Sequence, residues 1–317
     1  MLELDKVYHG DAFDLVKQLG EGTVNLVICS PPYFQQRNYT DSSLEVGREE
    51  TVDLYVDRLL SLFRSCLDAT AADGSLVWNL GDKYERGSLL LAPYRFAIEA
   101  RKHAMLVNNI TWVKTNPTPR QYRRRMVSST EPFFHFTKSA DYYYNVPEEH
   151  VETPAAKSNI GQGYYEQIAG SSLTDAQKAL ARKELEDAIA EVRAGAIPGF
   201  RMKISGVHRL PFGGQEGGRK TQMMTKGFTL IKLRGRKIER DVLEFPVETI
   251  KGMTHPAIYP RGLVAKLVEL LTRPGDLVFD PFVGSGTTAV VCKELNRRYI
   301  GFELNEEFAR LARERLA

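Results

Sequence analysis

Four residues near the amino terminus, Ser30, Pro31, Pro32 and Tyr33, have side chains and backbone groups suited to holding a planar amine. They follow the apolar run at residues 24–29, and two consecutive prolines stiffen the turn because each ring fixes its own φ and restricts the preceding residue. The Ser30 hydroxyl and the Pro31 carbonyl can accept hydrogen bonds from an NH2 group, while the Tyr33 ring offers a flat face to a heterocycle. The pattern predicts a site that methylates an exocyclic amine, although an ordinary loop after a strand could carry the same residues.

A second pattern, near the carboxyl terminus, predicts a nucleotide site. Residues 277–288 are typical of a short apolar strand, a glycine turn and a helix start, and residues 299–304 predict a further strand that ends near Glu303. This is the order of the first unit of a doubly wound nucleotide-binding fold, in which the terminal acid accepts hydrogen bonds from ribose hydroxyls. Glu303 lies 19 residues after Gly284, close to the roughly 20 expected for that role.

The glycine turn favours a ligand with one ribose over a dinucleotide. The fingerprint G-x-G-x-x-G is incomplete because Ala289 stands where the third glycine would be, but alanine is tolerated there, so NAD remains open. S-adenosylmethionine has one ribose and no pyrophosphate, and the amide groups and the Thr287 hydroxyl at the helix start can bind its carboxylate. We therefore predict S-adenosylmethionine as the cofactor.

Taken together, and in this order, several segments resemble the amino-methylating DNA methyltransferases. The catalytic block precedes the cofactor block, which is similar to the permuted, beta-type group of these enzymes, whose DNA-recognition segment lies between the two. Permutation is compatible with a compact domain, because chain termini usually lie on the surface and often near each other. The matching blocks are residues 8–12, 30–33, 77–82, 112–114, 255–257 and 280–288.

The resemblance implies an α/β fold: a doubly wound, mostly parallel, Rossmann-like sheet, permuted, with an inserted DNA-recognition domain. Residues 1–145 are expected to form the catalytic half of the core, residues 146–244 the inserted target-recognition region, and residues 245–317 the cofactor-binding half. For this to hold, the turn after residue 29 and the glycine turn near residue 285 must meet in one cavity, although some 250 positions separate them.

Site residues follow from the matching motifs. The catalytic residues are expected to be Ser30, Pro31, Pro32 and Tyr33. Asp11 is expected at the cofactor adenine, and it would also suit a helix N-cap. The expected cofactor-binding residues are Asp11, Asp280, Phe282, Gly284, Ser285, Gly286, Thr287, Glu303 and Asn305.

The cysteines bear on which atom is methylated. Cys29, Cys66 and Cys292 form no metal-ligand spacing, so we expect free thiols and no metal. Related enzymes that methylate carbon 5 of cytosine use a thiolate that follows a proline, and no Pro-Cys pair occurs here. An exocyclic amine needs no such thiolate, because its nitrogen can attack the sulfonium methyl directly.

The first residue of the catalytic tetrapeptide indicates the base. In the family, Ser at this position is usually associated with cytosine N4, and Asp or Asn with adenine N6. The resemblance thus implies a site-specific cytosine-N4 DNA methyltransferase that rotates its target out of the duplex, since a stacked base cannot present its amine. An N6-adenine enzyme, an RNA or protein-glutamine methyltransferase and an inactive DNA-binding relative are the alternatives.

Basic residues gather in two parts of a chain whose net charge is only +3. Residues 200–240 contain eleven Lys or Arg and two acids, and four arginines occupy residues 120–125. Two such clusters beside a base-modifying motif favour a surface for double-stranded DNA, although a solvated charged loop would have a similar composition. The expected DNA-binding residues are Arg123, Arg124, Arg125, Lys232, Arg234, Arg236 and Lys237.

The remaining expectations concern location, partners and local structure. No run is long and apolar enough to cross a bilayer and the first residues lack a secretory pattern, so we expect a cytoplasmic protein. The resemblance leaves a restriction endonuclease partner open, and also a homodimer, since related enzymes are often dimeric. Strands are expected at residues 4–9, 24–29, 75–80 and 228–233, and helices at 12–19, 50–71 and 173–194. The polar segment 35–47 could close over the flipped base or form an ordinary mobile loop.

Overall fold

This structure, a computed structural model, describes residues 2–37, 39–40, 42–117, 124–145, 159–209, 218–233, 239–248 and 259–317. The chain forms two compact units, one of residues 1–145 with 239–317 and one of residues 146–238. The boundary expected at residue 244 falls inside strand β10 (Val242–Phe245), which pairs with strand β6 (Met105–Lys114) of the first unit. The chain therefore rejoins the first unit at Glu239, six residues earlier than the expected residue 245.

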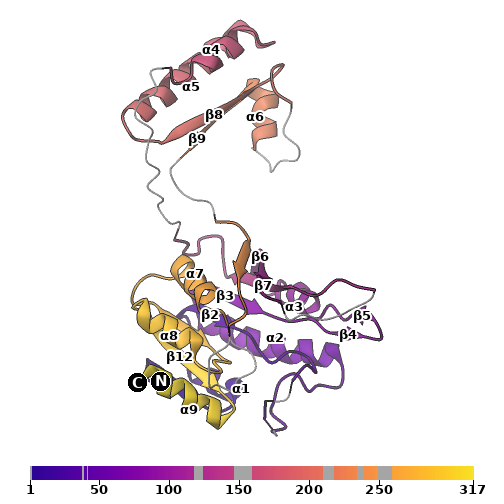
Figure 1. The fold of residues 1–317 in the computed structure, drawn as a ribbon. Helices are drawn as coiled ribbons and strands as arrows, with labels where there is room; N and C mark the ends of the chain where they lie inside the picture. Colours follow the sequence, from indigo (N-terminus) through magenta and orange to yellow (C-terminus); the bar gives the residue numbers. More distant parts are fainter. Residues whose placement is uncertain are drawn as a thin grey trace. The chain divides into compact units, whose positions relative to one another are not determined.

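The first unit is built on an eight-stranded sheet in the order β1-β12-β11-β2-β3-β7-β6-β10 (Figure 1). Neighbouring strands are parallel except where β7 is one of the pair. The predicted doubly wound, mostly parallel sheet is therefore confirmed. Besides β6 and β10, the strands are β1 (Lys6–His9), β2 (Val24–Cys29), β3 (Thr70–Asn79), β7 (Thr130–Thr137), β11 (Leu277–Asp280) and β12 (Arg298–Glu303).

Helices cover both faces of this sheet. In β2, Leu26 and Ile28 belong to one apolar cluster and Val27 and Cys29 to the other, and all four are fully buried. Successive strand residues point to opposite faces, so a strand buried on both faces reads as one continuous apolar run. Helices α1 (Ala12–Leu15), α2 (Val52–Ala69) and α3 (Ala92–Ala100) pack on one face, and α7 (Arg261–Leu271), α8 (Thr287–Glu294) and α9 (Glu306–Leu316), orange to yellow in Figure 1, on the other.

Strands β2 and β11 are direct neighbours although they lie far apart in the sequence. They pair in parallel, with Val278 beside Leu26 and Phe279 beside Val27. From β11 the chain passes through α8 to β12 on one side, and from β2 it passes through α2 to β3 on the other. The strand order thus reverses between β11 and β2, and ligands of open α/β sheets bind outside the carboxyl ends of the strands at such a point.

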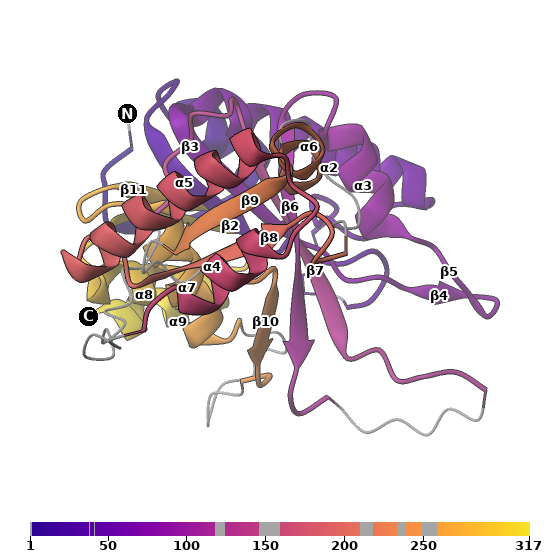
Figure 2. The same cartoon turned by 90° about the horizontal axis from the view of Figure 1, so that it is seen from above.

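The second unit has its own small core. It contains α4 (Gln162–Ala169), α5 (Asp175–Arg193), α6 (Arg219–Lys226) and the antiparallel pair β8 (Gly199–Ile204) and β9 (Phe228–Leu233). Figure 2 shows α4 and α5 lying along this pair, where Leu185 of α5 packs with Ile204 and Phe228. The predicted capping box is present, since Thr174 and Gln177 each accept a hydrogen bond from the other's backbone N–H.

Several elements differ from the sequence-based expectation or were absent from it. The first helix ends at Leu15 and continues as a 3-10 turn, η1 (Val16–Gln18). Strands β6 and β7, helices α3, α7 and α9, and the hairpin β4 (Tyr84–Glu85) and β5 (Ser88–Leu89) were not anticipated. The three cysteines are buried free thiols, as expected. Within the described ranges, no helix has the length and apolar character needed to cross a membrane.

Candidate active site

A cavity of about 850 Å³ opens where β2 and β11 end, and it contains most of the residues singled out from the sequence. The turn after β2 and the glycine turn after β11 both line it, so the two corners meet as expected. Gly286 and Asn305 are not among its lining residues. The expected residues that do line it are Asp11, Ser30, Pro31, Pro32, Tyr33, Arg125, Asp280, Phe282, Gly284, Ser285, Thr287 and Glu303.

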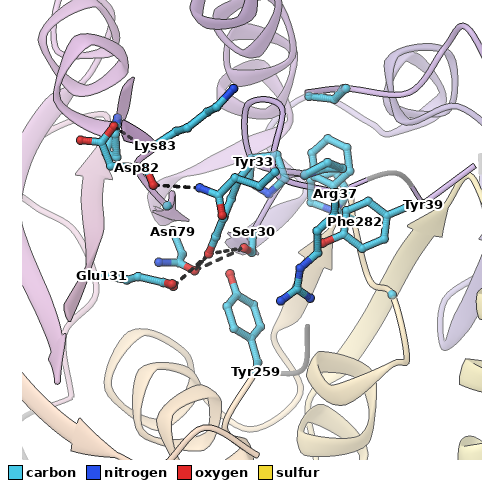
Figure 3. A pocket seen from close by; sticks show the side chains of 18 of the residues that line it. Ser30, Tyr33, Arg37, Tyr39, Asn79, Asp82, Lys83, Glu131, Tyr259 and Phe282 are labelled. Atoms are coloured by element: carbon cyan, nitrogen blue, oxygen red, sulfur yellow. Dashed lines mark hydrogen bonds between the residues drawn. The ribbon is translucent and has the colours of Figure 1, made fainter. Parts of the chain in front are cut away.

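Ser30 and Tyr33 form a hydrogen-bonded cluster at one end of the cavity (Figure 3). Ser30 Oγ lies 3.1 Å from Tyr33 Oη and 3.3 Å from Asn79 Oδ1. Tyr33 Oη lies 2.6 Å from Asn79 Oδ1 and 3.0 Å from Glu131 Oε2. Burial, and then the Glu131 carboxylate, raise the pKa of Tyr33 well above its usual range, so its hydroxyl stays protonated and can both accept and donate.

The Tyr33 ring is less open than the sequence indicated. One part of it lies against Gly81, where an added Cβ would come within 2.3 Å of ring carbons Cδ2 and Cε2. Glycine at position 81 therefore lets the backbone approach the ring closely, because any side chain there would collide with it. Any heterocycle that stacks on Tyr33 must use the ring surface that Gly81 leaves open.

Glu131 and Asn79 were not predicted as site residues. Asn79 ends β3, is fully buried, and donates from Nδ2 to the Pro132 carbonyl at 3.0 Å. Glu131 lies at the start of the reversed strand β7 and forms a largely buried ion pair with Lys114. In the sequence, Glu131 stands just ahead of the aromatic residues of β7, which was the one local sign of it. Only the pairing of β7 with β3 brings Glu131 to Tyr33.

Asp280 holds the start of the glycine turn. Its carboxylate accepts hydrogen bonds from the Phe282 N–H at 3.0 Å and the Thr288 hydroxyl at 2.6 Å. Burial raises the pKa of Asp280 to about 7, against the opposing effect of these two donors. Gly284 and Gly286 have φ of +52° and +85°, a left-handed conformation that glycine adopts without steric cost.

Glu303 holds the other side of the same turn. One carboxylate oxygen accepts from the Gly284 N–H at 2.9 Å and the other from the Asn305 N–H at 2.8 Å. Asn305 itself caps α9 by accepting from the Phe308 N–H, and its Nδ2 donates to the Tyr39 carbonyl at 2.8 Å. Asn305 therefore supports the segment around Tyr39 instead of lining the large cavity.

Arg315 was not anticipated at the glycine turn. It extends from α9, and its Nη1 donates to the carbonyl of Ser285 at 2.5 Å and lies 3.2 Å from Ser285 Oγ and 3.5 Å from Thr287 Oγ1. Burial lowers the pKa of Arg315 from its usual value. The hydroxyl groups expected to face the cofactor thus also face a cation of the protein.

Polar groups anchor the segment after Tyr33 on both sides of the cavity. Gln36 Nε2 donates to the Asp82 carbonyl at 2.9 Å, and the buried Glu45 accepts from the backbone N–H of Tyr39 at 2.6 Å. Asn305 binds the Tyr39 carbonyl from the glycine-turn side. These hydrogen bonds hold Gln36 and Tyr39, within the segment expected to be a polar cover, against elements on both sides of the cavity.

The expected DNA-binding residues are only partly visible. Arg123, Arg234, Arg236 and Lys237 lie outside the described residues. Arg124 is exposed, whereas the Arg125 guanidinium lies 3.6 Å from the centre of the Tyr84 ring and lines the cavity. Lys232 pairs with Glu191 of α5 at 2.6 Å, an acid that the local sequence did not reveal.

Comparisons with known proteins agree with this architecture. The model of a family described as DNA methylase, N6_N4_Mtase, matches residues 24–314. The chain is 26% identical to the Type II methyltransferase M.SmaI of Serratia marcescens, over 98% of this chain and 90% of that protein. It is 26% identical to the Type II methyltransferase M.SfiI of Streptomyces fimbriatus, over 95% and 88%.

Solved structures share the fold. The PvuII DNA methyltransferase (cytosine-N4-specific) matches with a TM-score of 0.61 at 18% identity, covering 98% of this chain and 86% of that one. A putative DNA modification methylase of Thermus thermophilus, complexed with S-adenosyl-L-methionine, matches with a TM-score of 0.56 at 21% identity, covering 98% and 93%.

The raised pKa of Asp280 predicts how a substitution changes stability with pH. A buried carboxyl with a folded-state pKa of about 7 and an ordinary value of 3.8 favours folding while protonated. That contribution, about 4 kcal/mol at most, is lost as pH rises through this window. Asn cannot ionise and so lacks this loss. As pH rises from about 4 to about 8, the difference in unfolding free energy should therefore shift in favour of the Asp280→Asn variant.

Urea unfolding of both proteins across that range provides the measurement. The parent serves as the control, because subtraction removes groups that titrate in both proteins, such as His135, whose pKa burial lowers to about 4. A difference that is constant with pH, or that favours the parent as pH rises, would contradict the assignment.

Proposed function

Because the chain belongs to the DNA methylase family, we propose that it transfers the methyl group of S-adenosylmethionine to the exocyclic N4 amine of a cytosine flipped out of a specific duplex sequence. The observation that carries the proposal is the shared cavity, in which the Ser30 and Tyr33 hydroxyls and the glycine turn at Gly284 line one space. Ser30 at the head of the tetrapeptide, and a structural neighbour named cytosine-N4-specific, support cytosine over adenine.

The residues at the glycine turn fit S-adenosylmethionine. A carboxylate has about four lone-pair positions, and the two backbone bonds of Glu303 leave the others for ribose hydroxyls. Phe282 offers an aromatic face to the adenine, and Asp11 lines the cavity while it also caps α1 through the Phe13 N–H at 3.0 Å. When bound, the cofactor supplies a methyl group on a sulfonium. Asn305 then acts on the cofactor indirectly, by holding the Tyr39 segment.

The cluster around Ser30 is arranged to hold the amine and to remove its surplus proton. Extrusion of a base costs a few kcal/mol, and stacking on the open part of Tyr33 returns about 1 to 3 kcal/mol. The Ser30 hydroxyl keeps lone pairs that accept an amine hydrogen, which directs the nitrogen lone pair away from the ring. Alignment of the amine with the methyl group supplies much of the remaining acceleration.

Once the nitrogen carries the methyl group, it holds one proton too many. Ser30 Oγ can take that proton while its own passes to Tyr33 Oη, 3.1 Å away, and the Tyr33 proton passes to Glu131 Oε2, 3.0 Å away. Glu131 ends protonated and later releases its proton to solvent. Because burial keeps Tyr33 protonated, its hydroxyl starts with the proton that it passes on.

The second unit is the proposed target-recognition region. Helix α6 exposes seven of its eight residues and buries only Met223. It contains three basic residues and no acid, and its exposed Arg219 and Gln222 are of the types that read guanine and adenine edges in the major groove. We therefore assign α6 to the DNA contact, together with the basic residues that follow β9 in the sequence, at positions 234, 236 and 237. The Type II names of the relatives support a restriction endonuclease as a partner of the system.

The product identifies the base. Duplex DNA incubated with the protein and S-adenosylmethionine should yield N4-methylcytosine on digestion and mass spectrometry, and sequencing of the modified positions gives the target sequence. Ser30→Ala is the control, expected to bind the cofactor and to give little product. N6-methyladenine would overturn the choice of base, and modification of RNA but not of duplex DNA would overturn the substrate.

Glu131 provides a test of the proton path. Glu131→Gln keeps the shape but cannot accept a proton, so the single-turnover rate should fall roughly 10²- to 10⁴-fold. Cofactor affinity should be unchanged. Glu131→Ala leaves space beside Lys114, and added formate should restore part of its rate as a replacement base.

Glu244→Gln, an exposed change on the edge strand β10, is the matched control and should retain the parent rate. A Glu131→Gln variant as fast as the parent, or a Glu131→Ala variant that formate does not accelerate, would rule out Glu131 as the final acceptor.

Salt dependence tests the role of α6. Lys220→Ala should weaken binding to duplexes of any sequence and reduce the slope of log affinity against log salt by about 1, because one phosphate contact is lost. Lys183→Ala on α5, also exposed and followed by Glu184, Glu186 and Asp187, removes the same charge and should leave the slope unchanged. Equal effects of the two substitutions would show that α6 has no special part in binding.

A further inference from the structure

Tyr259 places a hydroxyl inside the cavity that has no hydrogen-bond partner among the described residues. The residue stands just before α7, and Figure 3 shows its side chain pointing toward Ser30. No hydrogen bond joins the two hydroxyl groups, although Ser30 is close enough to act on the pKa of Tyr259 against the effect of burial. Burial raises the pKa of Tyr259 well above its usual range, so this hydroxyl stays protonated and is available as a donor.

Packing alone does not explain this hydroxyl. The Tyr259 ring lies 5.9 Å from that of Phe133, centre to centre, and a phenylalanine would keep this contact. A buried polar group without a partner lowers stability by about 1 to 3 kcal/mol, and such groups in folded proteins require a specific reason. The free hydroxyl therefore indicates a partner that arrives with the substrate.

The nearby acceptors of the protein are already engaged. Asn79 Oδ1 lies within hydrogen-bond distance of both Ser30 and Tyr33, and the Glu131 carboxylate binds Tyr33 and Lys114. Tyr259 thus points into the same space as Ser30, and no hydrogen bond to a described residue satisfies its hydroxyl. A ligand that presents an amine to Ser30 and an acceptor beside that amine would satisfy both hydroxyls at once.

We propose that Tyr259 donates a hydrogen bond to the ring nitrogen next to the exocyclic amine of the target base, which is N3 in cytosine. This inference rests on the proposed function, because it assumes that a flipped base enters the cavity. The pair of contacts at Ser30 and Tyr259 fixes the base at two adjacent atoms of its Watson–Crick edge, and so orients the amine. Tyr259 is then a positioning residue for the methyl transfer.

The same arrangement sets a selectivity. Thymine carries an N–H at the matching ring position and a carbonyl in place of the amine, so Tyr259 would face a donor and Ser30 an acceptor. Adenine presents an amine beside N1, an acceptor, in the same order as cytosine. Tyr259 therefore selects bases that carry an amine, and the choice between cytosine and adenine must come from other contacts.

Tyr259→Phe tests the proposal with two readouts of opposite sign. Without DNA the variant should unfold at a higher denaturant concentration than the parent, because an unsatisfied buried hydroxyl has been removed. On a duplex containing the mapped target, both binding and the single-turnover rate should fall, roughly 5- to 100-fold. On the same duplex with an abasic target, the variant and the parent should bind equally. Cofactor affinity, measured by calorimetry, should not change.

Tyr144→Phe, at an exposed tyrosine outside the cavity lining, is the matched control and should follow the parent in every assay. A Tyr259→Phe variant that is less stable than the parent would show that the hydroxyl has a partner in the free protein and would overturn the inference. The inference would also be overturned if the variant bound the abasic duplex more weakly than the parent does, or if it bound the cofactor more weakly. Methylation of duplex DNA by the parent would leave the proposed function standing in each of these cases.

Discussion

The parallel pairing of β2 with β11 is the constraint on which the site depends. These strands come from opposite ends of the chain, yet Leu26 and Val27 lie beside Val278 and Phe279. Parallel neighbours end at the same edge, so the pairing delivers the Ser30 turn and the glycine turn to one place. The strand order reverses between them, and the helices that follow diverge to opposite faces of the sheet. The edge between the two turns is therefore left uncovered, and the cavity follows from the topology.

Polar groups are buried at this edge, which lowers the stability of the fold. Asp280 is a buried carboxyl whose pKa is raised to about 7, and it remains there because the Phe282 N–H and the Thr288 hydroxyl bind it. Tyr33 is kept protonated by burial and by Glu131, and Tyr259 has a hydroxyl without a partner in the described chain. The stability that these groups forgo comes from the apolar clusters on the two faces of the sheet. A preorganised site of this kind binds its ligands without first having to rearrange.

The sequence predicted those features that depend on local pattern. Strand β2 and the capping box of α5 agree with expectation. Neighbouring residues alone define both, because the apolar run marks the two ends of the strand and the Thr-x-x-Gln pair marks the start of the helix. The residues that were missed reach the site only through tertiary structure. Glu131 needs the reversed pairing of β7, and Arg315 needs the return of α9 to the glycine turn. The same reason explains Lys232, whose acidic partner lies 41 residues away on another element.

The second unit is inserted into the chain of the first unit and has a core of its own. The chain leaves the first unit after Asn145, whose N–H donates to the Leu270 carbonyl, and returns at Glu239, shortly before the Asp241 carbonyl accepts from the Thr111 N–H. Both connections are thus hydrogen-bonded to residues of the first unit, Leu270 and Thr111, that do not line the cavity. Leu185, Ile204 and Phe228 give the second unit a core of its own. In the proposed function, substitutions on its surface, such as those of α6, alter the DNA sequence that is read while the paired ends of β2 and β11 remain as they are.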